Sequence, residues 1–156
     1  MKAVTLPEIK KELNMLSLQE TQQLCLRLAR FKKENKELLT YLLFESHNET
    51  GYIETIKNYI DNEFETINTN SYFYIRKSTR KILKNVKKYI RYSQKKESEV
   101  ELLLYFCAKL KNFKPSIKRS TQLQNMYNRQ IILAKKTISK LHEDLQYDFN
   151  VMLEKL

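Results

Sequence analysis

Catalysis or metal binding by this chain would have to use a short set of side chains. The chain has two histidines, His47 and His142, and two cysteines, Cys25 and Cys107. A cysteine nucleophile needs a base beside it, and a metal site needs several ligands at a defined spacing. Neither histidine belongs to an HExxH or a Glu-x-x-His pattern, and both cysteines lie within apolar helical runs. We therefore expect a pair of buried free thiols, with a disulfide between them as the alternative, and no metal site, no catalytic residues and no enzymatic activity.

Phosphate-binding loops and dinucleotide fingerprints are excluded by the glycine count. Both motifs need several glycines so that the backbone can approach the ligand closely, and the chain contains one glycine. Carboxylate pairs such as Glu63 with Glu65, and Glu97 with Glu101, fall on predicted exposed helix faces, where a solvated charge is the ordinary state. The sequence therefore predicts no bound cofactor.

Positive charge is the one chemical feature that is concentrated in the sequence. The net charge is +11, and the segment 66–96 holds ten basic residues and no acidic one. Residues 1–65 have a balance of −2, and residues 97–156 one of +3. A compositional preference for lysine would raise the lysine count everywhere, but it would not remove acidic residues from a single segment. The charge of this segment therefore indicates either a binding partner or a compensating acidic neighbour.

A helical projection of residues 72–96 separates this charge from an apolar face. The expected packing face spans an arc of roughly 120° and consists of Tyr72, Ile75, Thr79, Ile82, Leu83, Val86, Tyr89 and Ile90. The adjoining arc holds nine basic residues, called the cationic face below: Arg76, Lys77, Arg80, Lys81, Lys84, Lys87, Lys88, Arg91 and Lys95. Tyr74 and Tyr92 lie just beyond the cationic face and are candidates for stacking on unpaired bases.

Four interpretations of the cationic face compete. The charge can simply be solvated, or acidic neighbours can fold back and neutralise it, the candidates being Glu54, Asp61, Glu63, Glu65, Glu97, Glu99 and Glu101. It can bind an acidic partner protein, or it can track the phosphates of a nucleic acid without sequence preference. It can also lie on a membrane surface, but such helices need a free apolar face, and here that face is required by the core. Among binding partners, we favour an acidic protein over nucleic acid.

The elements that would position this face are all helices. One glycine and two prolines in 156 residues leave few residues suited to tight turns. Capping boxes at Thr5-x-x-Glu8 and Ser17-x-x-Glu20 predict the first two helix starts. The second helix ends near Asn35 or continues to about Ser46. Further helices are predicted over 53–67, 72–96 and 98–112, with breaks at 46–51, 68–71 and 112–116. From there to Leu156 the spacing predicts one long helix, or two helices broken near Asp144.

Taken as a whole, the sequence predicts an all-α fold, a compact bundle of about six helices in a single domain, residues 1–156. A faint similarity between residues 32–44 and 95–108 suggests a short helical repeat, although similar composition explains it more simply. The N-terminus has no apolar signal region, and the longest apolar runs are far below the roughly 20 residues of a membrane span. We expect a cytoplasmic protein without membrane insertion. A monomer is favoured, with a homodimer through the C-terminal helix as the alternative.

Overall fold

The computed structural model describes all 156 residues and is entirely helical, with no strand. Contacts divide the chain into two compact units, Met1–Phe44 and Glu45–Leu156. They are called the N-terminal and C-terminal units below. In chain order the elements are α1 (Leu6–Leu13), α2 (Leu18–Phe31), α3 (Lys33–Thr40), a π-helical turn (Tyr41–Glu45), α4 (Glu49–Glu65), α5 (Tyr72–Ser93), α6 (Lys96–Asn112), a 3₁₀ turn (Ile117–Arg119), α7 (Thr121–Ile138) and α8 (Glu143–Glu154). The all-α prediction is confirmed, with eight α-helices rather than about six.

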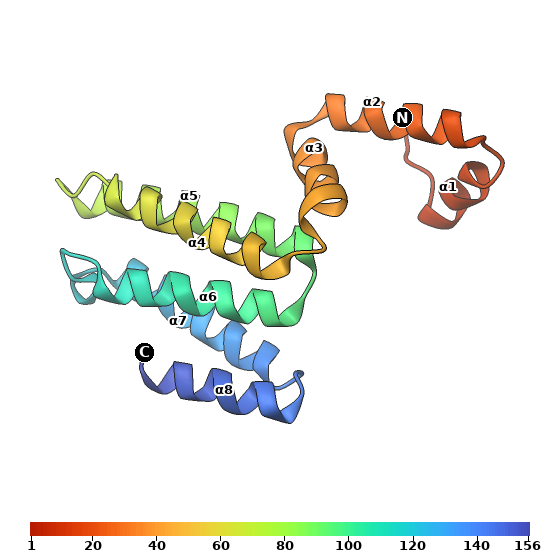
Figure 1. Ribbon diagram of the computed structural model, residues 1–156. Helices are drawn as coiled ribbons and strands as arrows, with labels where there is room; N and C mark the ends of the chain where they lie inside the picture. The colour runs from red at the N-terminus through yellow and green to blue at the C-terminus, as the bar shows by residue number, and fades with distance from the viewer. The chain divides into compact units, whose positions relative to one another are not determined.

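The C-terminal unit is built around α6. Consecutive helices in this unit run up and down (Figure 1), and α6 packs against α4, α5, α7 and α8. This position explains its sequence, because a helix that is covered on several sides needs apolar residues around most of its circumference. Eight of its residues are buried: Ser98, Val100, Leu102, Leu103, Leu104, Phe106, Cys107 and Leu110. Phe106 contacts Phe64 of α4 edge to face, with ring centroids 5.7 Å apart.

Helix α5 is held against α4 by two hydrogen bonds. The Tyr52 hydroxyl on α4 donates to the Tyr89 carbonyl at 3.0 Å, and the Asn85 amide donates to the Tyr59 hydroxyl at 2.6 Å. The helix ends at Gln94, which has a left-handed backbone (φ 57°, ψ 9°). A residue in this conformation reverses the chain after a helix, so α6 can begin two residues later at Lys96.

The N-terminal unit contains α1, α2 and α3, and α2 packs against α3. The predicted capping boxes are confirmed: the Ser17 hydroxyl accepts from the Glu20 amide at 3.2 Å, and the Ser17 amide donates to the Glu20 carboxylate at 2.8 Å. The second helix is shorter than either predicted alternative. It ends at Phe31 because Lys32 is extended (φ −146°, ψ 139°). The Asn35 side chain then donates to the free Leu28 carbonyl at 2.9 Å.

Two other boundaries differ from the sequence predictions. The break predicted at 46–51 is shorter, because Asn48 caps α4 by accepting from the Gly51 amide at 3.1 Å, so Gly51 lies inside the helix. The prediction of one long C-terminal helix is wrong. Two helices are present, and the break lies at 139–142 rather than near Asp144. The residues 32–44 form α3 and most of the π-helical turn, whereas α6 is one continuous helix, so the suggested repeat does not correspond to two copies of one structural element.

Candidate anionic-partner interface

Helix α5 has the two faces that its sequence predicts. Five residues of the expected packing face, Ile75, Thr79, Ile82, Val86 and Ile90, are buried, and Tyr72, Leu83 and Tyr89 are half-buried. The hydroxyl of Thr79 is satisfied inside this face, since it donates to the Ile75 carbonyl at 2.8 Å. The apolar half of α5 therefore belongs to the core of the C-terminal unit, and the helix cannot leave the fold to bind elsewhere.

The nine basic residues of the cationic face line one side of this helix. Six are exposed: Lys77, Arg80, Lys81, Lys84, Arg91 and Lys95. Arg76, Lys87 and Lys88 are half-buried, as expected where an aliphatic stem lies along the protein and the charged end reaches water. Lys95 lies just beyond α5 and is the N-cap of α6. At 1.5 Å per residue, the helical part of the row, from Arg76 to Arg91, extends over roughly 22 Å.

Acidic neighbours neutralise this face at two of its positions. Lys81 lies 3.3 Å from the Glu63 carboxylate of α4, and Lys95 lies 3.1 Å from Glu49. The other candidate acids pair elsewhere or not at all: Lys57 holds both Glu54 and Glu101 at 2.7 Å, and Lys109 holds Asp61 at 2.7 Å. Six members of the cationic face form no ion pair: Arg76, Lys77, Arg80, Lys84, Lys87 and Arg91.

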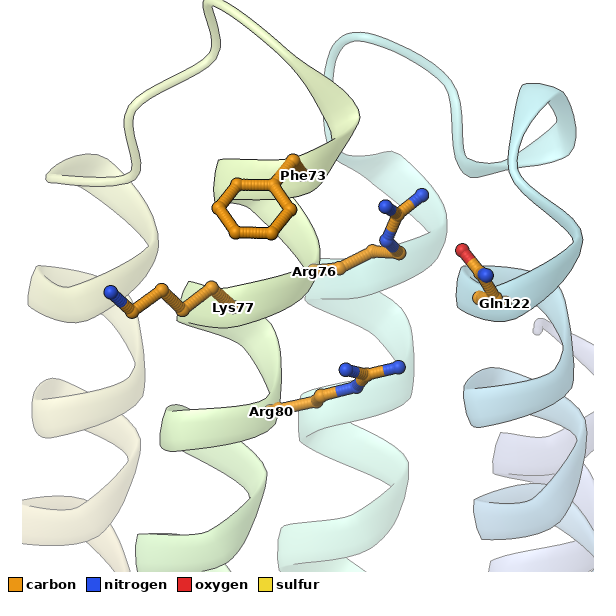
Figure 2. A pocket seen from close by; sticks show the side chains of 5 residues that line it. All are labelled: Phe73, Arg76, Lys77, Arg80 and Gln122. Atoms are coloured by element: carbon orange, nitrogen blue, oxygen red, sulfur yellow. The ribbon is translucent and has the colours of Figure 1, made fainter.

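The N-terminal end of the face opens into a hollow of ≈ 430 Å³ (Figure 2). It is lined by Phe73, Arg76, Lys77 and Arg80 of α5 and by Gln122 of α7. Arg76 and Arg80 are one helical turn apart and extend in the same direction, past α6 toward Gln122, whereas Lys77 extends toward α4. Two guanidinium groups and an amide therefore converge on one side of this hollow.

This arrangement is suited to holding an oxyanion. A guanidinium group presents its N–H donors as a planar fork that matches a carboxylate or a phosphate. Two such forks one turn apart repel each other, at a cost of a few tenths of a kcal/mol per pair. No carboxylate lines the hollow to offset that repulsion. A bound anion would offset it.

The aromatic residues near the face differ in their accessibility. Tyr74 exposes 46% of its surface, and the neighbouring Phe73 exposes 61%. Their rings meet edge to face at 5.5 Å. Tyr92 is half-buried and contacts the Tyr89 ring at 6.1 Å. Of the two tyrosines proposed from the sequence as stacking residues, Tyr74 is therefore the accessible one, and Phe73 is an accessible aromatic that the sequence reasoning did not select.

The remaining reactive side chains do not assemble into a site. No group of three or more His, Cys, Asp or Glu side chains is placed to hold a metal ion. The expectation of two buried thiols is wrong for Cys25, which is exposed, and correct for Cys107, which is buried in α6. Desolvation raises the pKa of the Cys107 thiol to about 12, which keeps it protonated and unreactive. His142 lies exposed at the start of α8, 3.5 Å from Asp144.

No protein-family model matches this chain, and no curated protein or solved structure is significantly similar to it. No helix has both the length and the apolar character needed to cross a membrane. The cationic face and the hollow at its end are thus the features from which a function can be inferred.

Proposed function

We propose that the protein is a non-enzymatic interaction module whose cationic face binds an acidic partner protein. The observation that supports this most strongly is the row of six basic side chains without an ion pair on one side of α5. Like charges one turn apart destabilise a helix slightly, and the chain has acidic residues nearby that pair with other lysines instead. A face on which six basic side chains have no acidic neighbour paired with them is suited to an anionic partner.

The spacing of the charges fits an acidic segment of a protein. Lys77, Arg80 and Lys84 follow one another at intervals of three and four residues, so neighbouring charges are about 5–6 Å apart at their Cβ atoms. Glutamates at the same intervals on a partner helix have the same separation. The two arginines at the hollow can each take a carboxylate through two parallel hydrogen bonds. Electrostatic complementarity of this kind mainly raises the association rate and sets the orientation of the partner.

One observation favours a second candidate, sequence-independent binding of single-stranded nucleic acid. Phe73 and Tyr74 are exposed next to Arg76 and Arg80. Proteins that bind single strands combine a basic surface that follows the phosphates with aromatic rings on which bases stack. A carboxylate-rich peptide has no bases to stack on those rings. The contribution of the two rings to binding affinity therefore distinguishes the two candidates.

The test is a binding measurement with two labelled probes, a 20-residue polyglutamate peptide and a 20-nucleotide oligothymidylate. Fluorescence anisotropy is recorded for the wild-type chain and for the triple variant Arg80→Glu, Lys84→Glu, Lys87→Glu. The matched control carries Lys135→Glu, Lys136→Glu and Lys140→Glu, three exposed lysines at and after the end of α7. Both variants change the net charge equally. We expect the peptide to bind wild type and the control alike, and at least tenfold more weakly to the α5 variant.

Each result distinguishes the candidates. Tighter binding of the oligonucleotide than of the peptide, weakened by Phe73→Ala and Tyr74→Ala, replaces the acidic protein with nucleic acid as the ligand. Equal loss of binding in the α5 variant and in the control shows that net charge alone is responsible, and it overturns the assignment to the cationic face. Absence of binding by both probes at low salt overturns both candidates.

A further inference from the structure

The N-terminal unit has well-defined helices but almost no core, because Tyr41 of the π-helical turn is its one buried residue. None of the residues of α1, α2 or α3 is buried. Fifteen of the twenty exposed large hydrophobic residues of the chain belong to residues 1–44. The starts of α1 and α2 are nevertheless determined by the local sequence. At each start a capping box makes hydrogen bonds of 2.7–2.8 Å, to Glu8 in α1 and to Glu20 in α2. The unit therefore consists of ordered helices that leave most of their large apolar side chains exposed.

Two apolar hollows lie along α2. One, of ≈ 550 Å³, is shared by α1 and α2 and includes Ile9, Leu13 and Leu24. The other, of ≈ 250 Å³, is shared by α2 and α3 and includes Cys25, Leu28 and Leu38. Large side chains also protrude from the same helix, among them Phe31, which exposes 83% of its surface. The unit thus offers both concave and convex apolar surface.

We propose that the N-terminal unit pairs with the same unit of a second copy of this chain. A segment of 44 residues is near the length of roughly 40 residues below which a fold needs disulfides, metals or oligomerisation to be stable. If an apolar face must be covered for the unit to be stable, its partner must always be present in the same amount as the chain itself. Another copy of the chain satisfies that condition, whereas a regulated partner does not.

The exposed apolar surface is large enough for a dimer interface, and α2 carries both hollows and protruding side chains. Fifteen large apolar side chains, each at least 36% exposed, correspond to apolar surface on the order of 1,000 Å². Each partner in a stable protein interface contributes about 800 Å². In a two-fold symmetric dimer the same patch must supply both hollows and protruding side chains, as α2 does. The rim of the larger hollow carries Glu8, Glu12 and Lys11, so the two copies can also pair opposite charges.

Light scattering after size-exclusion chromatography tests this proposal on the full chain. We expect a mass of twice 18.8 kDa at micromolar concentration, which falls on dilution. The double variant Leu28→Glu, Phe31→Glu should weaken the dimer at least tenfold. Both side chains are exposed, at 58% and 83%, so the substitutions do not disturb a core. The control is Ile132→Glu with Tyr147→Glu, at comparably exposed residues of α7 and α8 (66% and 71%), which should leave the mass unchanged.

Cys25 provides a second readout, which can be followed in the wild-type chain. It lines the smaller hollow and is exposed within one chain, whereas Cys107 is buried and unreactive. We expect its reaction with a thiol reagent to slow at least tenfold as the protein concentration rises, and to be concentration-independent in the Leu28→Glu, Phe31→Glu variant. A monomeric wild type at high micromolar concentration, with or without a protected Cys25, overturns the proposal. These variants leave the cationic face intact, so this result and the polyglutamate result stand or fall separately.

Discussion

The ammonium group of Lys81 lies 3.3 Å from the carboxylate of Glu63, and this is one of two ion pairs between α4 and the cationic face. Both side chains are partly exposed, so the pair contributes little to stability, about 0–1 kcal/mol. Its larger effect is electrostatic, because Glu63 places a negative charge against a surface proposed to bind anions.

The substitution Glu63→Gln should therefore strengthen binding while leaving the fold nearly unchanged. We expect the polyglutamate peptide to bind about two- to fivefold more tightly at low salt, and the free energy of unfolding to change by less than about 1 kcal/mol. Anisotropy titration and urea denaturation measure the two effects. The matched control is Glu65→Gln, an exposed carboxylate on the same helix without an ion pair. Weaker binding by the Glu63 variant would contradict the assigned role of this face.

The packing of α6 predicts the most damaging single substitution. Phe106 is fully buried and contacts Phe64 across to α4. Truncation of a buried phenylalanine to alanine typically costs about 3–5 kcal/mol, a large part of the stability of a domain of this size. Phe106→Ala should lower the urea midpoint sharply, whereas Tyr147→Ala, at an exposed site on α8, should shift the free energy of unfolding by less than about 0.5 kcal/mol.

The left-handed backbone at Gln94 predicts a stabilising substitution. Side chains with a Cβ atom are strained at φ 57°, and glycine adopts this conformation without that strain. Gln94→Gly should raise the free energy of unfolding by about 0.5–1 kcal/mol, and Gln94→Ala should not. Thermal denaturation of the two variants compares them directly. An equal effect of glycine and alanine would show that the side chain of Gln94, rather than its backbone, determines the stability of this turn.

The buried Cys107 predicts a loss of stability in alkaline solution. Desolvation raises the pKa of its thiol from 9.0 to about 12 in the folded protein. The folded state therefore retains a proton that the unfolded state releases between these two pH values, so stability is full below about pH 9 and falls as the pH rises. Tyr59, Tyr105 and Tyr127 also have raised pKa values, mainly through desolvation, and act in the same direction. Urea denaturation from pH 8 to pH 10 should show a steeper loss for wild type than for Cys107→Ala; identical slopes would contradict the assignment to this thiol.

Periodicity was sufficient to predict most of the C-terminal unit. The buried face of α5 and the position of α6 follow from the spacing of apolar residues. The scarcity of glycine and proline predicts helices throughout. The break after Phe31 was not predictable, because Lys32 belongs to a charged run with ordinary helix propensity and its extended backbone depends on how α3 packs on α2. The break at 139–142 also occurs without glycine or proline.

The candidate site was predictable in its charge but not in its shape. The helical projection placed nine basic residues on one side of α5, but it could not show that Glu63 and Glu49 pair with two of them while other acids pair elsewhere. Gln122 reaches the hollow from α7, about 40 residues away along the chain. No local sequence pattern predicts that Gln122 lies next to α5. Phe73 could have been found, because the same projection places it outside the packing face.

The most direct test of the central proposal is an NMR titration of the full chain with the polyglutamate peptide. We expect the largest amide shift changes in α5 between Arg76 and Arg91, with a smaller set near Gln122. These shift changes should disappear in the Arg80→Glu, Lys84→Glu, Lys87→Glu variant. Shift changes concentrated in the N-terminal unit or distributed over all exposed lysines, with α5 no more affected than α7, would contradict the proposal.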